Sequence, residues 1–234
     1  MKETTIIIEG KPFTYYDEMD DISYDASVPI SVEKAKELLQ TTKQLFNSRG
    51  IHFSLVFGTL LGAVRDNGLI KGDEDVDVFT DNEKELRRNL PYFYDNGLKV
   101  CRIYEHYYYS FHTTNNSYID VYIKDNFSFS IWSPWCYRLY KHAVPKWYLW
   151  KYDTVFFLGI ECLVPHKPER LLKLWYGKDW RIPVRGHSFR YDIPSHYWWR
   201  KHCKGKYDLF CYIFKLLLTN PFSFFRKFCK RLNH

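Results

Sequence analysis

Hydrophobic and polar positions along this 234-residue chain follow the period of helices in some segments and of strands in others. Behind Ser31, which is a suitable N-cap, apolar side chains recur on one helical stripe until Gly50 ends the pattern. The stripe consists of Val32, Ala35, Leu38, Leu39, Leu45 and Phe46. The pattern predicts an amphipathic helix between Ser31 and Gly50.

Apolar and alternating runs predict strands in much of the remaining chain. These runs are Thr4–Glu9, Ile51–Phe57, Val76–Thr80, Lys99–Tyr104, Tyr107–His112, Tyr118–Lys124 and Phe156–Val164. Shorter helices are expected over Thr59–Arg65, from Asp81 or Asn82 to near Asn89, and from Pro168 to Gly177. The residues between the first strand and Ser31 read as an irregular acidic lead-in.

Composition and charge indicate where the chain meets its partners. Aromatic residues make up 20% of the chain, and we expect some of them at a ligand cleft, an interface or a membrane surface. The net charge is +7, yet residues 1–85 hold 17 of the 27 acidic residues. From His196 onward, nine Lys or Arg residues accompany one acid, Asp208. This basic segment predicts an anionic partner, either nucleic acid or a membrane face.

The basic segment also favours a membrane over nucleic acid, because its charges are mixed with long apolar runs. Tyr207–Leu218 is mostly apolar, and Phe222–Arg231 interleaves Phe with Arg and Lys. We therefore predict that residues 196–234 form a helical tail that lies in a membrane interface. A C-terminal helix packed on the domain is the alternative. The chain lacks the roughly 18 consecutive apolar residues of a spanning helix, and its N-terminal apolar stretch is too short for a signal peptide.

The six cysteines form no CxxC pair, which argues against a redox motif or a zinc site. His196, His202 and Cys203 lie close together in sequence and could hold a metal. Free thiols in a reducing compartment are the simpler interpretation.

The richest chemistry lies in residues 57–79, which read FGTLLGAVRDNGLIKGDEDVDVF. Asp75 and Asp77 are two residues apart, so in a strand both side chains point to one face. Two carboxylates on one face repel each other unless a cation lies between them, and Mg²⁺ prefers such oxygen ligands together with phosphate oxygens. The alternative is a solvated acidic loop followed by one acid at a strand edge.

Asp120 is a candidate third acid, because it interrupts the alternating strand Tyr118–Lys124. A lone acid in a strand built for burial is costly unless it has a partner. If this strand lies beside the strand of Asp75 and Asp77, three carboxylates could hold one or two Mg²⁺ ions and stabilise phosphoryl transfer. Capping, or a salt bridge with a buried Arg, is the alternative role for Asp120.

The Gly58-Thr59 turn offers groups that bind phosphate. Backbone N–H groups at a helix start favour an anion there. The Thr59 hydroxyl adds a donor, and Arg65 lies one long side chain away. An ordinary strand-to-helix turn is the alternative, but the acidic strand that follows so closely makes the combination more specific.

Several segments together resemble the LicD family of phosphotransferases, which is related to the fukutin group. The segments are GTLLGAVRDNGLI followed by DEDVD, YIDVY at Tyr118–Tyr122, Val164-Pro165, LWYGKDW at Leu174–Trp180, and Pro183. The resemblance covers roughly residues 32–185 in the family's order. Lys71-Gly72 replaces the family's usual Pro-Trp before the acids, so no role is carried over to these two positions.

The resemblance implies an α/β (α+β) fold for residues 1–195, with a nucleotidyltransferase-like mixed sheet and flanking helices. It implies transfer of a phospho-substituent, such as phosphocholine or a polyol phosphate, from a CDP-linked donor. The acceptor would be a sugar hydroxyl of a cell-surface glycan or glycolipid, such as lipopolysaccharide, capsule or teichoic acid. We expect a bacterial enzyme at the cytoplasmic face of the membrane that binds no nucleic acid.

The resemblance also assigns roles to individual residues. Asp75, Asp77 and Asp120 become ligands of Mg²⁺ or Mn²⁺, and Asp120 becomes the base for the acceptor hydroxyl. Donor-phosphate contacts fall to Gly58, Thr59 and Arg65. The donor pocket would be shaped by Tyr176, Gly177 and Trp180, although Trp175 and Trp180 are equally suited to the core.

Two other functions compete with this one. A glycosyltransferase also binds a nucleotide-sugar through a metal and an Asp-x-Asp motif. That function, however, does not account for the GTLLG turn or for Asp120 on a second strand. A non-catalytic binding protein with the same fold has no need of three intact aspartates. Release of CMP from a CDP-alcohol favours the phosphotransferase, and release of UDP from a UDP-sugar favours the glycosyltransferase.

Overall fold

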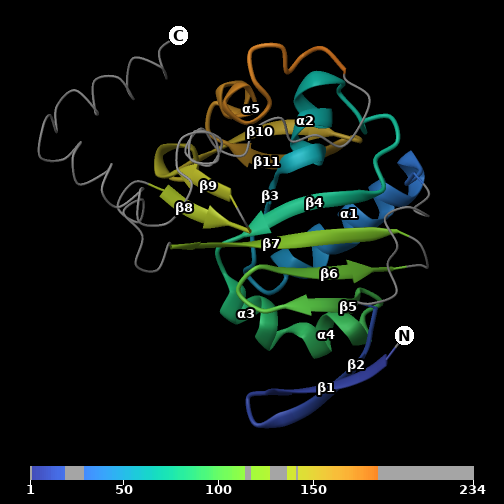
Figure 1. The fold of residues 1–234 in the computed structure, drawn as a ribbon. Helices are drawn as coiled ribbons and strands as arrows, with labels where there is room; N and C mark the ends of the chain where they lie inside the picture. The colour runs from blue at the N-terminus through green and yellow to red at the C-terminus, as the bar shows by residue number, and fades with distance from the viewer. Residues whose placement is uncertain (1, 19–28, 114–116, 127–135, 141, 184–234) are drawn as a thin grey trace, which may run out of the picture. The chain divides into compact units, whose positions relative to one another are not determined.

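The computed structural model describes residues 2–18, 29–113, 117–126, 136–140 and 142–183 (Figure 1). All these ranges belong to one compact unit, residues 1–184. The tail predicted over residues 196–234, the domain boundary at residue 195 and the His196, His202 and Cys203 group lie outside the described residues. None of the described helices is long and apolar enough to cross a membrane.

A mixed sheet of nine strands forms the middle of this unit (Figure 1). Its strands are β3 (Ser54–Leu55), β4 (Asp75–Thr80), β5 (Lys99–Tyr104), β6 (Tyr108–His112), β7 (Tyr118–Asn126), β8 (Cys136–Leu139), β9 (His142–Pro145), β10 (Tyr152–Phe157) and β11 (Ile160–Pro165). Their order is β10-β11-β3-β4-β7-β6-β5, and β8 pairs with both β7 and β9. The pairs β4–β7 and β11–β3 are parallel, while the other pairs are antiparallel.

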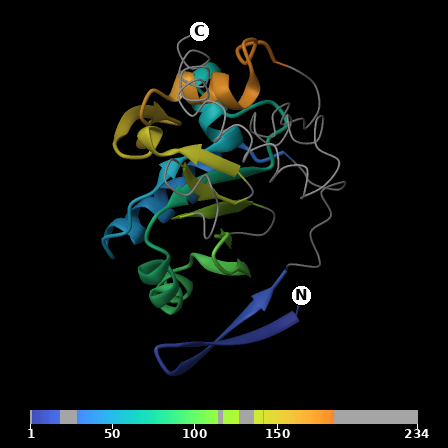
Figure 2. The same ribbon diagram turned by 60° about the vertical axis from the view of Figure 1, so that its left-hand side comes forward.

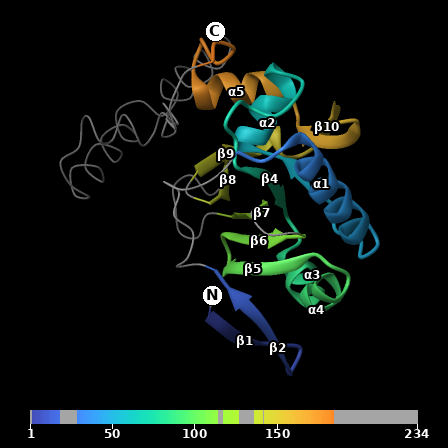
Figure 3. The same ribbon diagram turned by 90° about the vertical axis from the view of Figure 1, so that its right-hand side faces the viewer.

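Helices pack against this sheet, which confirms the predicted α/β class. They are α1 (Val32–Asn47), α2 (Phe57–Arg65), α3 (Glu83–Arg88), α4 (Leu90–Asp95), the 3₁₀ turn η2 (Lys146–Tyr148) and α5 (Pro168–Tyr176). Figure 3 shows α1, α3 and α4 on the same side of the sheet. There the Phe46 ring of α1 lies 4.9 Å from Phe93 and 6.0 Å from Phe111, so aromatic packing builds the core on this side.

The predicted helix starts are confirmed at two caps. The Ser31 Oγ accepts the backbone N–H of Lys34 at 3.3 Å ahead of α1. The Asn82 side chain accepts the N–H of Glu85 at 3.3 Å ahead of α3. Both contacts satisfy N–H groups that a helix start leaves unpaired.

The predicted strand Phe156–Val164 is wrong, because two antiparallel strands occupy this region. They meet at a two-residue turn, Leu158-Gly159, whose φ angles are both positive at 52° and 77°. Positive φ at both central residues is typical of the tight turns that match the twist of a hairpin. The apolar pattern runs unbroken through this turn, so only the glycine marks it.

The first strand after α1 is also shorter than predicted. Ile51–Phe57 contributes only the two residues of β3 to the sheet, and α2 already begins at Phe57 rather than at Thr59. Phe57 has a φ of +44° and is 4% exposed. A bulky residue in the left-handed region is strained, and here its ring is held between Tyr122 and Trp175.

Five further elements were not predicted from the pattern: β2 (Lys11–Asp17), α4, β8, β9 and the 3₁₀ turn η2. The region expected to be an irregular lead-in contains β2, which pairs with β1 (Lys2–Ile8) in a separate two-stranded sheet. Figure 2 shows this hairpin set apart from the large sheet. The N–H of Glu18 reaches the carbonyl of Cys101 on β5 at 2.8 Å and ties the hairpin's end to the sheet.

Candidate active site

Two parallel strands bring the predicted carboxylates together. Asp77 on β4 pairs in register with Asp120 on β7, so the two side chains point to the same face of the sheet. Asp75 lies on that face too, two residues before Asp77. Asp77 is 9% exposed and Asp120 is 6% exposed, so these carboxylates are largely removed from water. The structure therefore brings all three predicted acids to one place.

Burial and mutual repulsion shift the titration of these acids. Burial raises the pKa of Asp75 well above its ordinary value, and the nearby charges of Asp120 and Asp73 raise it further. The pKa of Asp77 is also raised well above the ordinary range, first by burial and then by Asp75, Asp120 and Asp73. Uncompensated negative charge on both residues is what a bound cation would relieve.

Asp120 has partners of its own. Its Oδ1 accepts a hydrogen bond from the Ser110 hydroxyl at 2.5 Å and lies 3.2 Å from Nη2 of Arg102, which is 4% exposed. Burial raises the pKa of Asp120, while Arg102 and Ser110 act in the opposite direction. The buried-Arg alternative for Asp120 is thus present in the same site as the carboxylate cluster, and the two do not exclude each other.

These contacts follow from strand register. Across β4, β7, β6 and β5, one row of paired positions carries Asp77, Asp120, Ser110 and Arg102. Neighbours in such a row lie close enough for side chains to meet. The row therefore begins with the carboxylates of Asp77 and Asp120 and ends with the guanidinium of Arg102.

The Gly58-Thr59 turn contacts the aspartates directly. The Gly58 N–H donates to Oδ2 of Asp77 at 3.2 Å, and the Asp77 N–H donates to the Thr59 hydroxyl oxygen at 2.7 Å. A Cβ placed on Gly58 would lie 3.4 Å from carboxylate oxygens of both Asp73 and Asp77. The turn therefore presents Gly58 to two acids, while its contact with a donor phosphate stays a prediction.

Arg65 and Tyr176 approach the same site from two helices. Arg65 at the end of α2 donates from Nε and Nη2 to Asp66 at 2.8 and 2.7 Å. Burial raises the pKa of Tyr176 on α5, and Asp77 and Asp73 raise it further. Tyr176 therefore lies beside the carboxylates, while its contact with a donor stays a prediction.

Gly177 and Trp180 have structural roles in the described unit. Gly177 has a φ of +90° and caps α5, donating its N–H to the carbonyl of Lys173 at 3.0 Å. Trp180 is 4% exposed, belongs to the hydrophobic core and has the Arg181 guanidinium 4.2 Å from its ring. Trp175 is likewise in the core. Donor contacts from Gly177 and Trp180 stay predictions.

Asp73, Ser110, Arg102 and Tyr122 complete the site, although the predicted set of site residues did not contain them. Asp73 already stood in the acidic run of the sequence, so its signal was present. Ser110 and Arg102 have no local signal, because only the pairing of β5, β6 and β7 brings them to Asp120. Burial and the charges of Asp77, Asp120 and Asp75 raise the pKa of Tyr122 well above its ordinary value.

The donor set fits a hard divalent cation by its chemistry, since it consists of carboxylate oxygens that repel one another. Within the ranges that the structure describes, however, no three His, Cys, Asp or Glu side chains already stand in a metal-binding arrangement. A bound cation would therefore have to draw Asp75, Asp77 and Asp120 together. Their role as metal ligands stays a prediction.

A cavity of about 520 Å³ lies elsewhere, at the start of α5. It is lined by Trp147, Tyr148, Trp150, Lys151, His166, Lys167 and Arg170. The nine residues of α5 place its two ends about 13 Å apart, and Tyr176 marks the end beside the carboxylates. The cavity is therefore separate from the acidic site.

Comparison with known proteins gives a family and distant relatives. The profile described as "LicD/FKTN/FKRP, nucleotidyltransferase domain" matches residues 50–167. Ribitol-5-phosphate transferase FKTN of Mus musculus is 26% identical over 185 residues, which are 76% of this chain and 39% of that protein. FKTN of Homo sapiens is 26% identical over 171 residues, which are 70% of this chain and 36% of that protein. The chain thus spans well under half the length of these relatives.

Among solved structures, the lincomycin-bound crystal structure of the lincosamide antibiotic adenylyltransferase LnuA is similar at 11% identity. The match covers 58% of this chain and 84% of that chain with a TM-score of 0.41, a likeness too low to add to the family assignment. The matched profile covers both carboxylate strands and the Gly58 turn, and it confirms the predicted resemblance. The chain belongs to the LicD/FKTN/FKRP nucleotidyltransferase-domain family.

Proposed function

We propose that this chain is a metal-dependent phosphotransferase that moves a phospho-substituent from a CDP-linked donor to a sugar hydroxyl. The observation that carries the proposal is the register of Asp77 with Asp120, which gathers these two buried carboxylates and the half-buried Asp75 on one face beside the Gly58 turn. Family membership supports the reaction class, because the named relatives are ribitol-5-phosphate transferases.

Asp75 and Asp77 would hold a Mg²⁺ or Mn²⁺ ion, with Asp120 as the third ligand. When bound, the cation neutralises negative charge on the donor pyrophosphate. The Gly58 turn and Arg65 would contact the donor phosphates, and Arg65 would exchange part of its pairing with Asp66 for them. Tyr176 would close the pocket from the side of α5.

Asp120 would also accept the proton of the acceptor hydroxyl. The acceptor oxygen forms a bond to the distal phosphorus of the donor, and the bond from that phosphorus to CMP breaks, so CMP leaves with the electron pair. Ser110 and Arg102 both contact Oδ1 of Asp120, and we assign the proton to Oδ2. Burial of Asp120 raises its pKa, which makes it a stronger base than an exposed aspartate.

The donor alcohol and the acceptor are finer parts of the proposal. The FKTN name makes ribitol phosphate the first group to test, with phosphocholine and other polyol phosphates next. We place the acceptor on a cell-surface glycan or glycolipid, such as lipopolysaccharide, capsule or teichoic acid. The same proposal includes contact of residues 196–234 with the anionic cytoplasmic face of a membrane. Flotation of the full chain with acidic vesicles tests this contact.

The decisive experiment incubates the purified chain and Mg²⁺ with CDP-ribitol, CDP-glycerol, CDP-choline or UDP-glucose and measures the nucleotide released when water takes the place of the acceptor hydroxyl. CMP release from a CDP-alcohol that stops on adding EDTA is the expected result. Asp77→Asn should abolish the release, while Asp95→Asn, at an exposed position on α4, should not. UDP release without CMP release would instead favour the glycosyltransferase alternative.

A further inference from the structure

Five tyrosines gather next to the carboxylates and take no part in the mechanism above. We call Tyr104, Tyr107, Tyr108, Tyr122 and Tyr140 the tyrosine cluster. Three of them form the row of the sheet that follows the Asp77 row, because Tyr122 pairs with Tyr108 and Tyr108 pairs with Tyr104. They therefore lie on the same face as Asp120, which is two residues from Tyr122 and about 7 Å away along the strand.

The rings of the tyrosine cluster are in continuous contact. The Tyr122 ring lies 5.8 Å from Tyr108 and 5.9 Å from Tyr140, while Tyr108 and Tyr140 are 5.7 Å apart. Tyr104 lies 5.9 Å from Tyr108 and stacks on Tyr107 at 4.6 Å. Because strands are about 5 Å apart, the row from Tyr122 to Tyr104 spans about 10 Å.

The cluster is neither fully buried nor fully open. Tyr104 is 46% exposed, and the other four side chains are half-buried. By contrast, Tyr109, whose side chain points to the opposite face of β6, is completely buried in the core. Half-buried rings on the site face provide an apolar surface with polar phenol groups that a ligand can reach.

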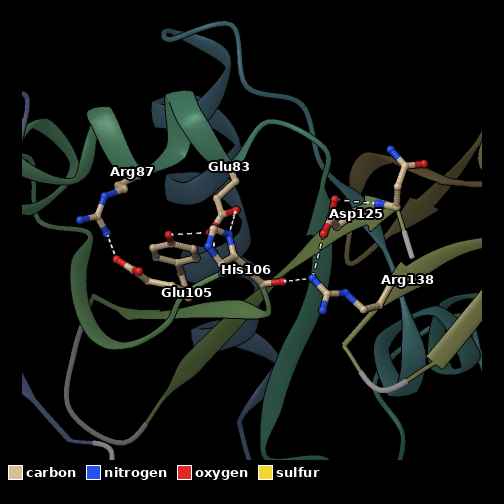
Figure 4. A network of polar contacts seen from close by, with 8 residues as sticks. Glu83, Arg87, Glu105, His106, Asp125 and Arg138 are labelled. Atoms are coloured by element: carbon tan, nitrogen blue, oxygen red, sulfur yellow. Dashed lines mark hydrogen bonds and ion pairs between the residues drawn. The ribbon is translucent and has the colours of Figure 1, made fainter. Parts of the chain in front are cut away.

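A polar network fixes the turn that presents Tyr104 and Tyr107 (Figure 4). Glu83 on α3 accepts the backbone N–H of His106 at 2.8 Å and contacts its Nδ1 at 3.0 Å. Arg138 on β8 donates to the His106 carbonyl at 3.3 Å and to Asp125 at 2.8 Å. The same guanidinium lies 4.6 Å from the Tyr107 ring.

A rigid turn suits a binding surface, because little conformational entropy is lost when the ligand arrives. The network joins α3, β7 and β8 to the turn between β5 and β6 (Figure 4), so the backbone that carries Tyr104 and Tyr107 is held from several sides. The Arg87–Glu105 ion pair adds a further tie between α3 and the turn.

The charge beside the cluster indicates which ligand it takes. The rings adjoin Asp75, Asp77 and Asp120. The nearby guanidinium groups already pair with acids: Arg102 with Asp120, and Arg138, 4.6 Å from the Tyr107 ring, with Asp125. The donor phosphates would meet these carboxylates through the proposed cation, whereas an anionic ligand on the rings has no such cation and would be repelled by the carboxylates. A neutral polyhydroxyl ring can lay its C–H face on an aromatic ring and hydrogen-bond with phenol groups at its edge.

We propose that the tyrosine cluster is the acceptor subsite, where a neutral sugar of the glycan stacks on Tyr104, Tyr107 and Tyr108 and directs a hydroxyl toward Asp120. This inference rests on the proposed function for the identity of the site. The row leads from the exposed ring of Tyr104 to Tyr122 beside the carboxylates, so a glycan entering along it would end at Asp120.

Saturation-transfer NMR tests the subsite without any knowledge of the natural acceptor. The full-length chain with Mg²⁺ is mixed with neutral methyl hexosides, a methyl N-acetylhexosaminide, methyl glucuronide and CMP. We expect signals from neutral glycosides and CMP but not from the glucuronide. In Tyr104→Ala the glycoside signals should fall about fivefold relative to the CMP signal, which is the order expected for losing one stacking ring.

Two variants control for folding and for ring chemistry. Tyr16→Ala removes a tyrosine of similar exposure, 55%, on the separate hairpin and should leave the glycoside signals unchanged. Tyr104→Phe keeps the ring face and should retain most of the signal. Glycoside signals that survive Tyr104→Ala would overturn the inference. Loss of the CMP signal with unchanged glycoside signals would also overturn it and would make the cluster a nucleobase site.

The same samples separate this inference from the proposed function. Glycoside binding that depends on Tyr104, in a chain that releases no CMP from any CDP-alcohol, would refute the transferase and leave the sugar subsite standing. If the chain releases CMP but Tyr104→Ala leaves glycoside binding unchanged, the transferase stands and the sugar subsite is refuted.

Discussion

Asp77 of β4 and Asp120 of β7 lie directly opposite each other on two parallel strands. This single pairing determines which side chains meet on the site face of the sheet. It sets Asp75 and Asp120 near each other, continues through Ser110 to Arg102, and places Tyr122 in the next row. A shift of one residue between the strands would turn Asp120 into the apolar core.

Removing one carboxylate should stabilise the metal-free protein. In Asp75→Asn the repulsion with Asp77 and Asp120 disappears, so we expect the melting temperature at pH 7.5 to rise by about 2–4 °C, corresponding to about 1 kcal/mol. The same variant should release no CMP. Thermal unfolding in EDTA measures the first effect, and a melting temperature below that of the unchanged protein would contradict it.

The stability of the metal-free protein should depend on pH through the same acids. A carboxyl whose pKa is higher in the folded than in the unfolded chain binds more protons when folded, so the free energy of unfolding falls as pH rises above about 4. Because Asp75 and Asp77 have raised pKa values, the stabilisation by Asp75→Asn should be small near pH 4.5 and grow toward pH 8. A difference in melting temperature that is constant across this range would refute the coupling.

Arg102 should be needed to keep Asp120 stable as a buried anion. Arg102→Met leaves that carboxylate without its ion pair, and breaking a buried pair typically costs about 3–5 kcal/mol. Urea unfolding should show this loss in Arg102→Met, and much of it should be recovered in the double variant Arg102→Met/Asp120→Leu. If the two changes are simply additive, the ion pair does not contribute as the geometry indicates.

Gly62 should tolerate no side chain. A Cβ at this position would lie 2.5 Å from the carbonyl oxygen of Gly68 and 3.1 Å from the backbone nitrogen of Ile70. Gly62→Ala must push α2 away from the loop that leads to the acids, at a cost of about 1–3 kcal/mol. Gly68→Ala is the matched control, because its Cβ would meet only one atom within 4 Å, at 3.9 Å. Equal unfolding free energies for both variants would contradict the close approach.

Local sequence patterns were sufficient for the first half of the site. The i, i+2 spacing of Asp75 and Asp77 fixed their common face, and the alternation of Tyr118–Lys124 placed Asp120 opposite the apolar side of its strand. The caps at Ser31 and Asn82 were equally readable, because a side-chain oxygen before an apolar stripe is a local signal.

The other half depends on pairing between strands, which the pattern does not encode. The register of β5 on β6 shifts between Val100 and Arg102, so Val100 pairs with Phe111 in the core while Arg102 pairs with Ser110 on the site face. Strict alternation would place Val100 and Arg102 on the same face. A bulge of one residue thus places the Arg102 guanidinium beside Asp120, and no sequence motif predicts this bulge.

Binding of Mn²⁺, followed by its electron paramagnetic resonance signal in the presence of CMP, tests the central claim that these carboxylates form a cation site. The unchanged chain should bind Mn²⁺, Asp77→Asn should bind it at least about tenfold more weakly, and Asp95→Asn should bind it as the unchanged chain does. Equal affinity of the unchanged chain and Asp77→Asn, or no binding by either, would contradict the account.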